Sequence, residues 1–230
     1  RPLVVIDAGH GGHDPGAISP FGSRREEDAT LAISLQLRDA LIASGRVRVA
    51  LTREDDRYLV HRERYEIARR LDAALFISVH IDSAPNPEAR GATVYTLSEV
   101  ASDREAALLA RRENSSDIIN GIDLGGEDAA VRSILIDLTQ RETLNVSARF
   151  ANLLDRVGGE YIGFKPDHHR FASLAVLKAP DVPSVLFEAG YLTNAAEAEI
   201  VFGRAGQRRI AQGLARAIET HFARAIAVAD

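Results

Sequence analysis

Hydrophobic residues along this chain fall either in short continuous runs or at helical spacing. The short runs, rich in valine, isoleucine and leucine, predict buried strands at residues 3–7, 47–52, 74–80, 91–97, 173–178 and 184–188. Apolar positions three and four residues apart predict helices at residues 29–44, 61–71 and about 206–225. Strands and helices that alternate along a chain form a mostly parallel, twisted sheet flanked by helices. We therefore predict a single α/β domain over residues 1–230.

The segment 98–161 interrupts this alternation, because helical spacing continues through it without a strand. Residues 98–145 are predicted to form a helical insertion, in which acidic residues outnumber arginines. Glycines at Gly121 and at 125–126 divide its apolar face into jointed pieces. On the pattern alone, a plain covering for the sheet is the simpler interpretation of this insertion.

Two of the predicted strands deliver a histidine. The run at 4–6 leads into a glycine-rich turn that carries His10, and the run at 74–77 leads to His80. Glycines in such a turn permit backbone angles and close approaches that a Cβ would block. Open α/β sheets place their active sites at the C-terminal ends of the strands. We expect the two histidines to lie side by side there, although a lone loop histidine is more often structural.

Carboxylates complete a candidate metal site. Glu26 and Glu27 fall in the first turn of a helix, where the helix dipole alone would also favour acids, and Glu188 ends an apolar strand. Two imidazoles with one carboxylate form the ligand set of a catalytic zinc site, and a second carboxylate can transfer protons. Because the chain has no cysteine, any zinc ligand must be His, Asp or Glu.

Five stretches of the chain closely resemble the zinc-dependent N-acetylmuramoyl-L-alanine amidases, the cell-wall family often called amidase type 3. They are VVIDAGHGGHDPGA, GSRREEDATLAI, SVHIDSAP, RGATVYTL and PSVLFEAGYLTN. The resemblance implies that His10, Glu26 and His80 bind Zn²⁺ and that Glu188 is the catalytic carboxylate. The usual Glu-Lys pair of the family is Glu26-Glu27 here, so Glu27 remains an alternative ligand.

The same resemblance implies a function. Such an enzyme cleaves the amide bond between N-acetylmuramic acid and L-alanine of the peptidoglycan stem peptide, in the periplasm, for cell-wall remodelling and daughter-cell separation. Division-associated members carry an insertion whose helix blocks the zinc site until an activator displaces it. Glu113, in an Arg-Glu-Asn stretch, is then the expected inhibitory zinc ligand. The implied activator contains a degenerate metallopeptidase-like (LytM) domain.

Other polar residues have two interpretations each. Asp7, on the strand before His10, either orients a ligand imidazole or is a buried structural carboxylate. His169, expected in a polar loop, is a candidate for contact with substrate. The arginine-rich helix at 62–70 contains interleaved glutamates, which predicts a solvated, ion-paired face.

Composition limits the remaining possibilities. A net charge of -5 argues against nucleic-acid binding, and no stretch is long enough to cross a membrane. The absence of methionine leads us to expect an excised catalytic domain without its signal peptide, and we separately expect a monomer. A zinc peptidase and an inactive wall-binding module are the alternatives, and the presence of all four site residues weighs against the second.

Overall fold

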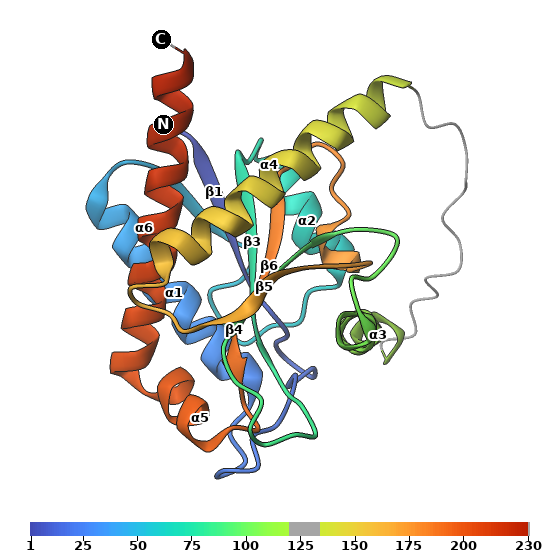
Figure 1. Ribbon diagram of the computed structural model, residues 1–230, viewed down its shortest axis with the longest axis vertical. Coiled ribbons are helices and arrows are strands. Elements are labelled where there is room, and N and C mark those ends of the chain that lie inside the picture. The colour runs from blue at the N-terminus through green and yellow to red at the C-terminus, as the bar shows by residue number, and fades with distance from the viewer. Residues whose placement is uncertain (120–133, 230) are drawn as a thin grey trace.

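A six-stranded sheet forms the middle layer of the computed structural model, which describes residues 1–119 and 134–229 (Figure 1). Its strand order is β2-β1-β3-β6-β4-β5. The strands span β1 (Leu3–Ala8), β2 (Arg48–Leu51), β3 (Leu75–Asp82), β4 (Ala92–Leu97), β5 (Phe164–Ala172) and β6 (Ser184–Tyr191). Strands β2, β1, β3 and β6 pair in parallel. Strand β4 pairs antiparallel with β6 and parallel with β5. The predicted mostly parallel α/β sheet is confirmed.

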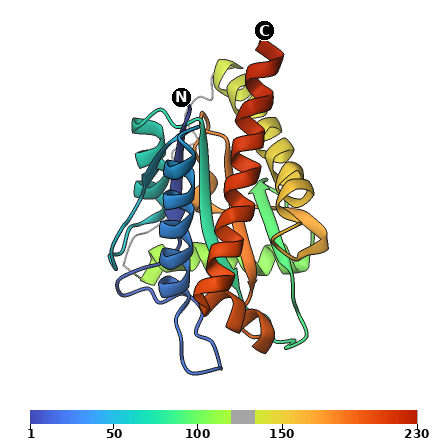
Figure 2. The same ribbon diagram turned by 90° about the vertical axis from the view of Figure 1, so that its left-hand side faces the viewer.

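Helices cover both faces of this sheet. One face packs against α1 (Glu26–Ser44), α4 (Ile134–Gly158) and α6 (Arg204–Ala229), with α5 (Ala195–Phe202) beside α6. The other face packs against α2 (His61–Arg70), α3 (Arg104–Ile119) and a short 3₁₀ helix, η1 (Ala175–Leu177). In Figure 2, α1 and α6 lie in front of the strands, and α3 runs across the strand direction behind them.

The alternation of side chains along the strands places the polar candidate residues together on one face of the sheet. On β1, Val4 and Ile6 point into the core beneath α1, whereas Leu3 and Val5 belong to the second core, with α2. Farther along the strands, this second face turns polar at Asp7, Ser78, His80, Asp82 and Glu188. The second face is therefore apolar at one end and polar at the C-terminal ends of β1, β3 and β6.

The strand predicted at 173–178 is wrong. That apolar run forms η1, which is buried among the residues of the second core, and β5 lies in the preceding segment that the sequence indicated as a polar loop. Because β5 is at the edge of the sheet and partly exposed, it needs few apolar residues. A short apolar run by itself does not distinguish a strand from a buried helical turn.

The segment 98–161, predicted as helical throughout, contains two helices in its described part. Helix α3 begins at Arg104, and α4 continues without a break past residue 145, the predicted end of the insertion, to Gly158. The joints predicted at Gly121 and at 125–126 lie outside the described residues. Among the helices that the structure describes, none combines the length and apolar character that a membrane span requires.

Candidate functional site

His10 is presented by a strained turn directly after β1. Its φ of 61° is left-handed, which is uncommon for a residue with a side chain. The Nδ1 atom of His10 lies 2.9 Å from Oδ2 of Asp14, whose Oδ1 accepts a hydrogen bond from the Gly16 amide at 3.1 Å. Asp14 thereby fixes the imidazole and leaves Nε2 facing the interior. The sequence left this role open for Asp7, with a structural carboxylate as the alternative. The signal available for Asp14 was an acid four residues after His10 in the same turn.

Two buried arginines hold the backbone of this turn. Arg64 donates to the carbonyl oxygens of Ala8 at 2.7 Å and His10 at 2.8 Å. Arg53 donates to Ala8 and Gly9, both at 2.9 Å. The two guanidinium groups thus bind carbonyl groups of the turn that lie out of contact with water.

Asp7 balances the charge of Arg64. Its carboxylate lies 3.0 Å from Arg64 Nη1 and accepts hydrogen bonds of 2.6 Å from the hydroxyls of Thr52 and Ser78. Although burial opposes ionisation, Arg64 and the two hydroxyls hold the pKa of Asp7 below its usual value. These contacts are those of a buried structural carboxylate, and among the described residues Asp7 has no hydrogen bond to His10 or His80.

Arg64 is an exception to the predicted solvated, ion-paired face of α2, on which Arg69 contacts Glu66 at 2.8 Å. Arg62 and Arg70 are exposed, but Arg64 is 3% exposed and points under the turn at His10. The buried positions of α2 are 61, 64, 65 and 68, which follow helical spacing. That spacing was the signal from which a buried Arg64 could have been predicted.

Four side-chain atoms converge between β1, β3, α1 and α3. Glu26 Oε1 lies 3.1 Å from His10 Nε2 and 3.3 Å from His80 Nδ1. Glu113 Oε2 lies 3.4 Å from His10 Nε2 and 3.1 Å from His80 Nδ1. All four residues are buried, and His10 Nε2, His80 Nδ1 and Glu113 Oε2 have no hydrogen-bond partner among the described residues. Such a cluster of converging, unpaired ligand atoms can hold a metal ion.

Backbone amides orient Glu26 in the first turn of α1. Its Oε1 accepts a hydrogen bond from the Ile81 amide at 2.9 Å, and its Oε2 accepts one from the Ala17 amide at 2.8 Å. Glu27 instead accepts a hydrogen bond from Arg25 at 3.1 Å. The structure therefore brings Glu26, and not Glu27, to the two imidazoles.

Two glycines let these ligands approach the backbone. A Cβ atom at Gly9 would lie 2.5 Å from the His80 ring. A Cβ atom at Gly16, where φ is +65°, would lie 2.6 Å from both Glu26 Oε2 and His10 Cδ2. The glycine-rich turn is thus a packing requirement of the cluster as well as a conformational one.

The electrostatics of the cluster favour positive charge at its centre. Although burial opposes protonation, Glu26 and Asp14 raise the pKa of His10 to about 10, and Glu113 and Glu26 raise that of His80 to about 10. Despite their burial, the same imidazoles lower the pKa of Glu113 to about 2 and that of Glu26 well below its usual range. A divalent cation supplies the charge that two ionised carboxylates attract, and its binding displaces the imidazole protons.

Glu188 lies beside the cluster in a different environment. It pairs in register with His80 on the neighbouring strand, is 1% exposed, and has no hydrogen-bond partner for either oxygen among the described residues. Burial and the nearby carboxylates of Asp82, Glu113 and Glu26 raise its pKa well above the usual value. A carboxyl group of this kind is suited to accept and return a proton.

Helix α3 closes over these groups through Arg112. This guanidinium donates to Asp82 at 2.9 Å, to the Ser83 carbonyl at 3.1 Å and to Glu113 Oε1 at 3.0 Å. A hollow of about 360 Å³ borders the cluster where α3 meets the turn, and its lining includes Asp14, Ile18, Ser83, Arg112, Ser116 and Thr193. Glu113 itself is 3% exposed, so α3 separates the cluster from solvent.

His169 does not join the site. Its Nε2 lies 2.9 Å from the Thr96 hydroxyl, and it pairs with Val94, a residue of the core beneath α4. Glu188 pairs with Thr93, one position earlier on the same strand. Because successive residues of a strand face opposite sides, His169 lies on the face of the sheet opposite to Glu188. Its predicted contact with substrate at the cluster is corrected accordingly.

A family model and several relatives match this sequence over most of its length. A family model described as N-acetylmuramoyl-L-alanine amidase matches residues 4–220. The N-acetylmuramoyl-L-alanine amidase AmiA of Escherichia coli (strain K12) is 36% identical over 96% of this chain and 76% of its own length. AmiC of Neisseria meningitidis, with the same description, is 34% identical over 96% of this chain and 53% of its own length. The chain thus spans about half the length of that relative.

Solved structures share the fold. The catalytic domain of CwlV, an N-acetylmuramoyl-L-alanine amidase from Bacillus (Paenibacillus) polymyxa var. colistinus, is similar with a TM-score of 0.69 and 26% identity, covering 97% of this chain and 99% of its own. The amidase AmiC2 of Nostoc punctiforme gives a TM-score of 0.68 at 26% identity, over 96% of this chain and 97% of its own.

We expect Arg64→Met to lower the free energy of unfolding by about 3–5 kcal/mol, because Asp7 would remain as an unpaired buried charge. The measurement is urea denaturation in the presence of a chelator, so that metal binding does not contribute. Arg62→Met, on the exposed side of α2, is the matched control and should change stability by less than about 0.5 kcal/mol. Equal effects of the two substitutions would contradict the role given to Arg64.

Gly16→Ala should weaken metal affinity by about 10- to 100-fold, as measured by chelator competition, because the new methyl group displaces Glu26 and His10. Gly22→Ala is the control, since Gly22 also has a positive φ of +82° but no atom within 4 Å of its Cβ position. Both variants place a side chain at a positive φ and therefore bear the same backbone strain, but only Gly16→Ala should lose metal affinity. A matching loss at Gly22 would refute the packing argument.

Proposed function

The chain belongs to the N-acetylmuramoyl-L-alanine amidase family, and from this premise we propose that it is a zinc-dependent peptidoglycan hydrolase. Its substrate bond is the amide between N-acetylmuramic acid and the L-alanine of the stem peptide. One observation carries the proposal: the ligand atoms of His10, Glu26 and His80 converge beside Glu188, a buried carboxyl group without a hydrogen-bond partner among the described residues.

The donor set and its spacing are compatible with zinc. Tetrahedral zinc with bonds of about 2.0–2.1 Å to nitrogen and oxygen requires ligand atoms about 3.3 Å apart. The four distances from Glu26 and Glu113 to the two imidazoles are 3.1, 3.3, 3.4 and 3.1 Å. His10, Glu26 and His80 would hold the ion, and Glu113 would take the fourth position. When bound, zinc supplies Lewis acidity toward water and a carbonyl oxygen.

Glu188 performs the proton transfers in this proposal. Its raised pKa makes it a base strong enough to take a proton from the attacking water and an acid able to return that proton. The proton goes to the nitrogen of the departing L-alanine, because an amine leaves readily only when it is neutral. Burial of Glu188 keeps competing water away from this exchange.

We further infer that α3 keeps the enzyme inactive. Glu113 Oε2 occupies the position that the reacting water or carbonyl would need, and the contacts of Arg112 with Asp82 and Ser83 keep it there. A protein activator with a LytM domain would displace α3, which would fit a role in daughter-cell separation. The substrate locates this activity outside the cytoplasmic membrane, in the periplasm. The inhibition rests on the contacts of Glu113 with the two imidazoles, whereas the activator, the division role and the location follow only from the family resemblance.

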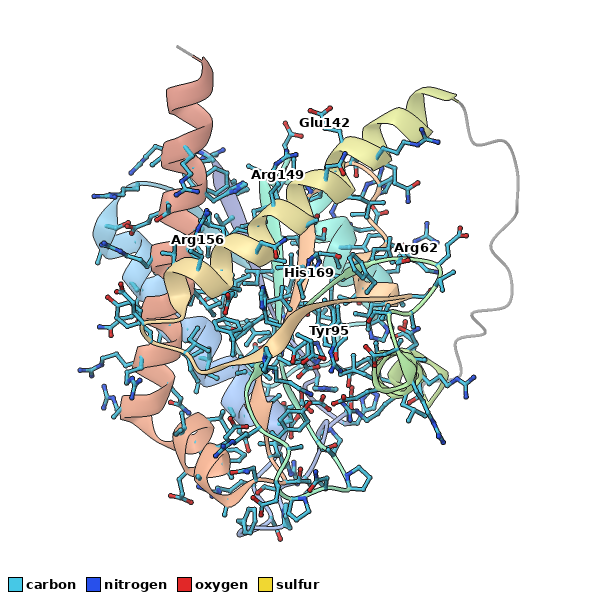
Figure 3. The ribbon with its side chains drawn as sticks, in the orientation of Figure 1. Arg62, Tyr95, Glu142, Arg149, Arg156 and His169 are labelled. Carbon is cyan, nitrogen blue, oxygen red and sulfur yellow. The ribbon has the colours of Figure 1, made fainter. Side chains whose placement is uncertain are left out.

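Glu113→Ala should raise the basal release of peptides from purified sacculi by about 10- to 100-fold, the range expected when one charge-assisted contact is lost. Mass spectrometry of the products identifies the cleaved bond and separates an amidase from a peptidase. Glu142→Ala, an exposed acid on α4, is the control and should leave the basal rate unchanged (Figure 3). An unchanged rate in zinc-loaded Glu113→Ala would refute the inhibition.

Glu188→Gln, introduced into the Glu113→Ala protein, should lower kcat by about 10²- to 10⁴-fold, because the carboxamide of glutamine cannot accept and return the proton. Zinc content, measured by mass spectrometry of the metal, should stay at the level of the parent. Glu199→Gln, at an exposed position three residues before the end of α5, serves as control. Full activity of the Glu188 variant would overturn the catalytic assignment.

A further inference from the structure

Helix α3 presents a row of side chains at four-residue intervals toward the sheet. The row consists of Glu105, Leu109, Glu113 and Asp117, and residues at this spacing share one helix face. Glu113 reaches the metal cluster, and Asp117 accepts hydrogen bonds from the Tyr58 hydroxyl at 2.9 Å and the His61 amide at 3.1 Å. Glu105 lies about 12 Å along the axis from Glu113 and therefore reaches a different part of the sheet.

Three donors from the sheet surround the carboxylate of Glu105. Arg170 Nη1 donates to Oε2 at 2.8 Å, and the Tyr191 hydroxyl donates to Oε1 at 2.7 Å. Lys165 Nζ lies 3.2 Å from Oε1 and 3.4 Å from Oε2. Although burial opposes ionisation, these donors lower the pKa of Glu105 to about 2. We call Lys165, Arg170 and Tyr191 the carboxylate receptor.

The receptor is built into the sheet and does not belong to α3. Lys165 and Arg170 lie on β5, and Tyr191 ends β6. Arg170 is 6% exposed and Tyr191 is 1% exposed, so their positions are fixed by packing. Arg170 also binds Asp167, and Lys165 also contacts the Tyr191 hydroxyl at 3.1 Å. The donors would therefore stay together, with a place for one carboxylate, if α3 moved away.

The position of the receptor relative to Glu188 indicates which part of a substrate would reach it. Along the strand order, His10 follows β1, His80 lies on β3, Glu188 on β6 and Arg170 on β5. Strand β4 lies between these last two strands, and its Tyr95 pairs with Arg170. If Glu188 gives its proton to the departing amine, the start of the peptide lies beside β6, and the receptor lies farther along the sheet on the side away from the metal cluster, within reach of the groups that follow that amine.

We propose that Lys165, Arg170 and Tyr191 bind a free carboxylate of the peptide portion of the substrate, and that Glu105 occupies this subsite in place of that carboxylate while α3 is docked. The inference rests on the proposed amidase function. Both carboxylate oxygens of Glu105 are already hydrogen-bonded by the receptor, which is the arrangement that a peptide carboxylate requires. A carboxamide in the same place would bring an NH₂ group against cationic donors.

A binding experiment tests the receptor without requiring turnover. The probes are the dipeptide L-alanyl-D-glutamine, whose free group is the α-carboxylate that a γ-linked stem peptide also leaves free, and its α-carboxamide, titrated into the full chain and followed by NMR. Glu105→Ala should bind the carboxylate form about 10- to 100-fold more tightly than the carboxamide, the range of one charge-assisted hydrogen bond. The unsubstituted chain should bind both weakly, because Glu105 fills the subsite.

The two lysines of the chain provide a matched pair of variants. In the Glu105→Ala background, Lys165→Gln should bring the ratio of the affinities for the carboxylate and the carboxamide probe close to one. Lys178→Gln, at an exposed position after η1, should leave this ratio unchanged. Tyr191→Phe, which removes only the hydroxyl, should reduce the preference in part. Equal binding of both probes to Glu105→Ala, or a preference unchanged by Lys165→Gln and Tyr191→Phe, would overturn the proposal.

A kinetic experiment keeps this proposal separate from the amidase proposal. With the matching muramyl dipeptides and the Glu113→Ala, Glu105→Ala protein, Lys165→Gln should raise KM for the carboxylate form about 10-fold or more and leave kcat nearly unchanged. Hydrolysis of neither muramyl dipeptide by the zinc-loaded protein, with the binding preference intact, would refute the amidase and support the receptor. Hydrolysis of both with equal KM would refute the receptor and support the amidase.

Discussion

The turn that presents His10 depends on two buried guanidinium groups. Arg53 and Arg64 supply donors to three successive carbonyl groups, the last of β1 and the first two of the turn. Asp7 supplies the charge that makes the burial of Arg64 tolerable. A buried charge that loses its partner is costly, so the turn, β1, β3 and α2 form one interdependent unit. The left-handed backbone of His10 persists because this unit determines it from several sides.

Three glutamates near the cluster differ in chemistry because their surroundings differ. Glu26 receives two backbone amides and faces both imidazoles, which favours its ionised form. Glu188 receives no hydrogen bond among the described residues and faces other carboxylates, which favours its protonated form. Glu113 comes from a separate helix, so its place at the cluster depends on the docking of α3. The different surroundings thus suit the same side chain to the three roles proposed for it, metal ligation, proton transfer and inhibition.

The docking of α3 combines a small apolar contact with many charged ones. Ala106, Leu109 and Ala110 reach the second core, while Glu105, Arg112, Glu113 and Asp117 bind polar groups of the sheet and of α2. Water or a substrate can replace polar partners at a lower net cost than it can replace buried apolar surface. An element held in this way is suited to reversible displacement, as the proposed inhibition requires.

The sequence by itself determined the fold class, the two histidines at neighbouring strand ends, and Glu188. These features depend on local patterns: apolar runs of strand length, glycines beside a histidine, and a carboxylate at the end of a buried strand. Only the tertiary structure decided that Asp14 orients His10, that Arg64 is buried, that β5 and not residues 173–178 completes the sheet, and that Glu105 meets Lys165, Arg170 and Tyr191. Each of these depends on contacts between residues far apart in the chain, or on the path of a turn, and spacing along one segment does not encode which partner a buried charge will find.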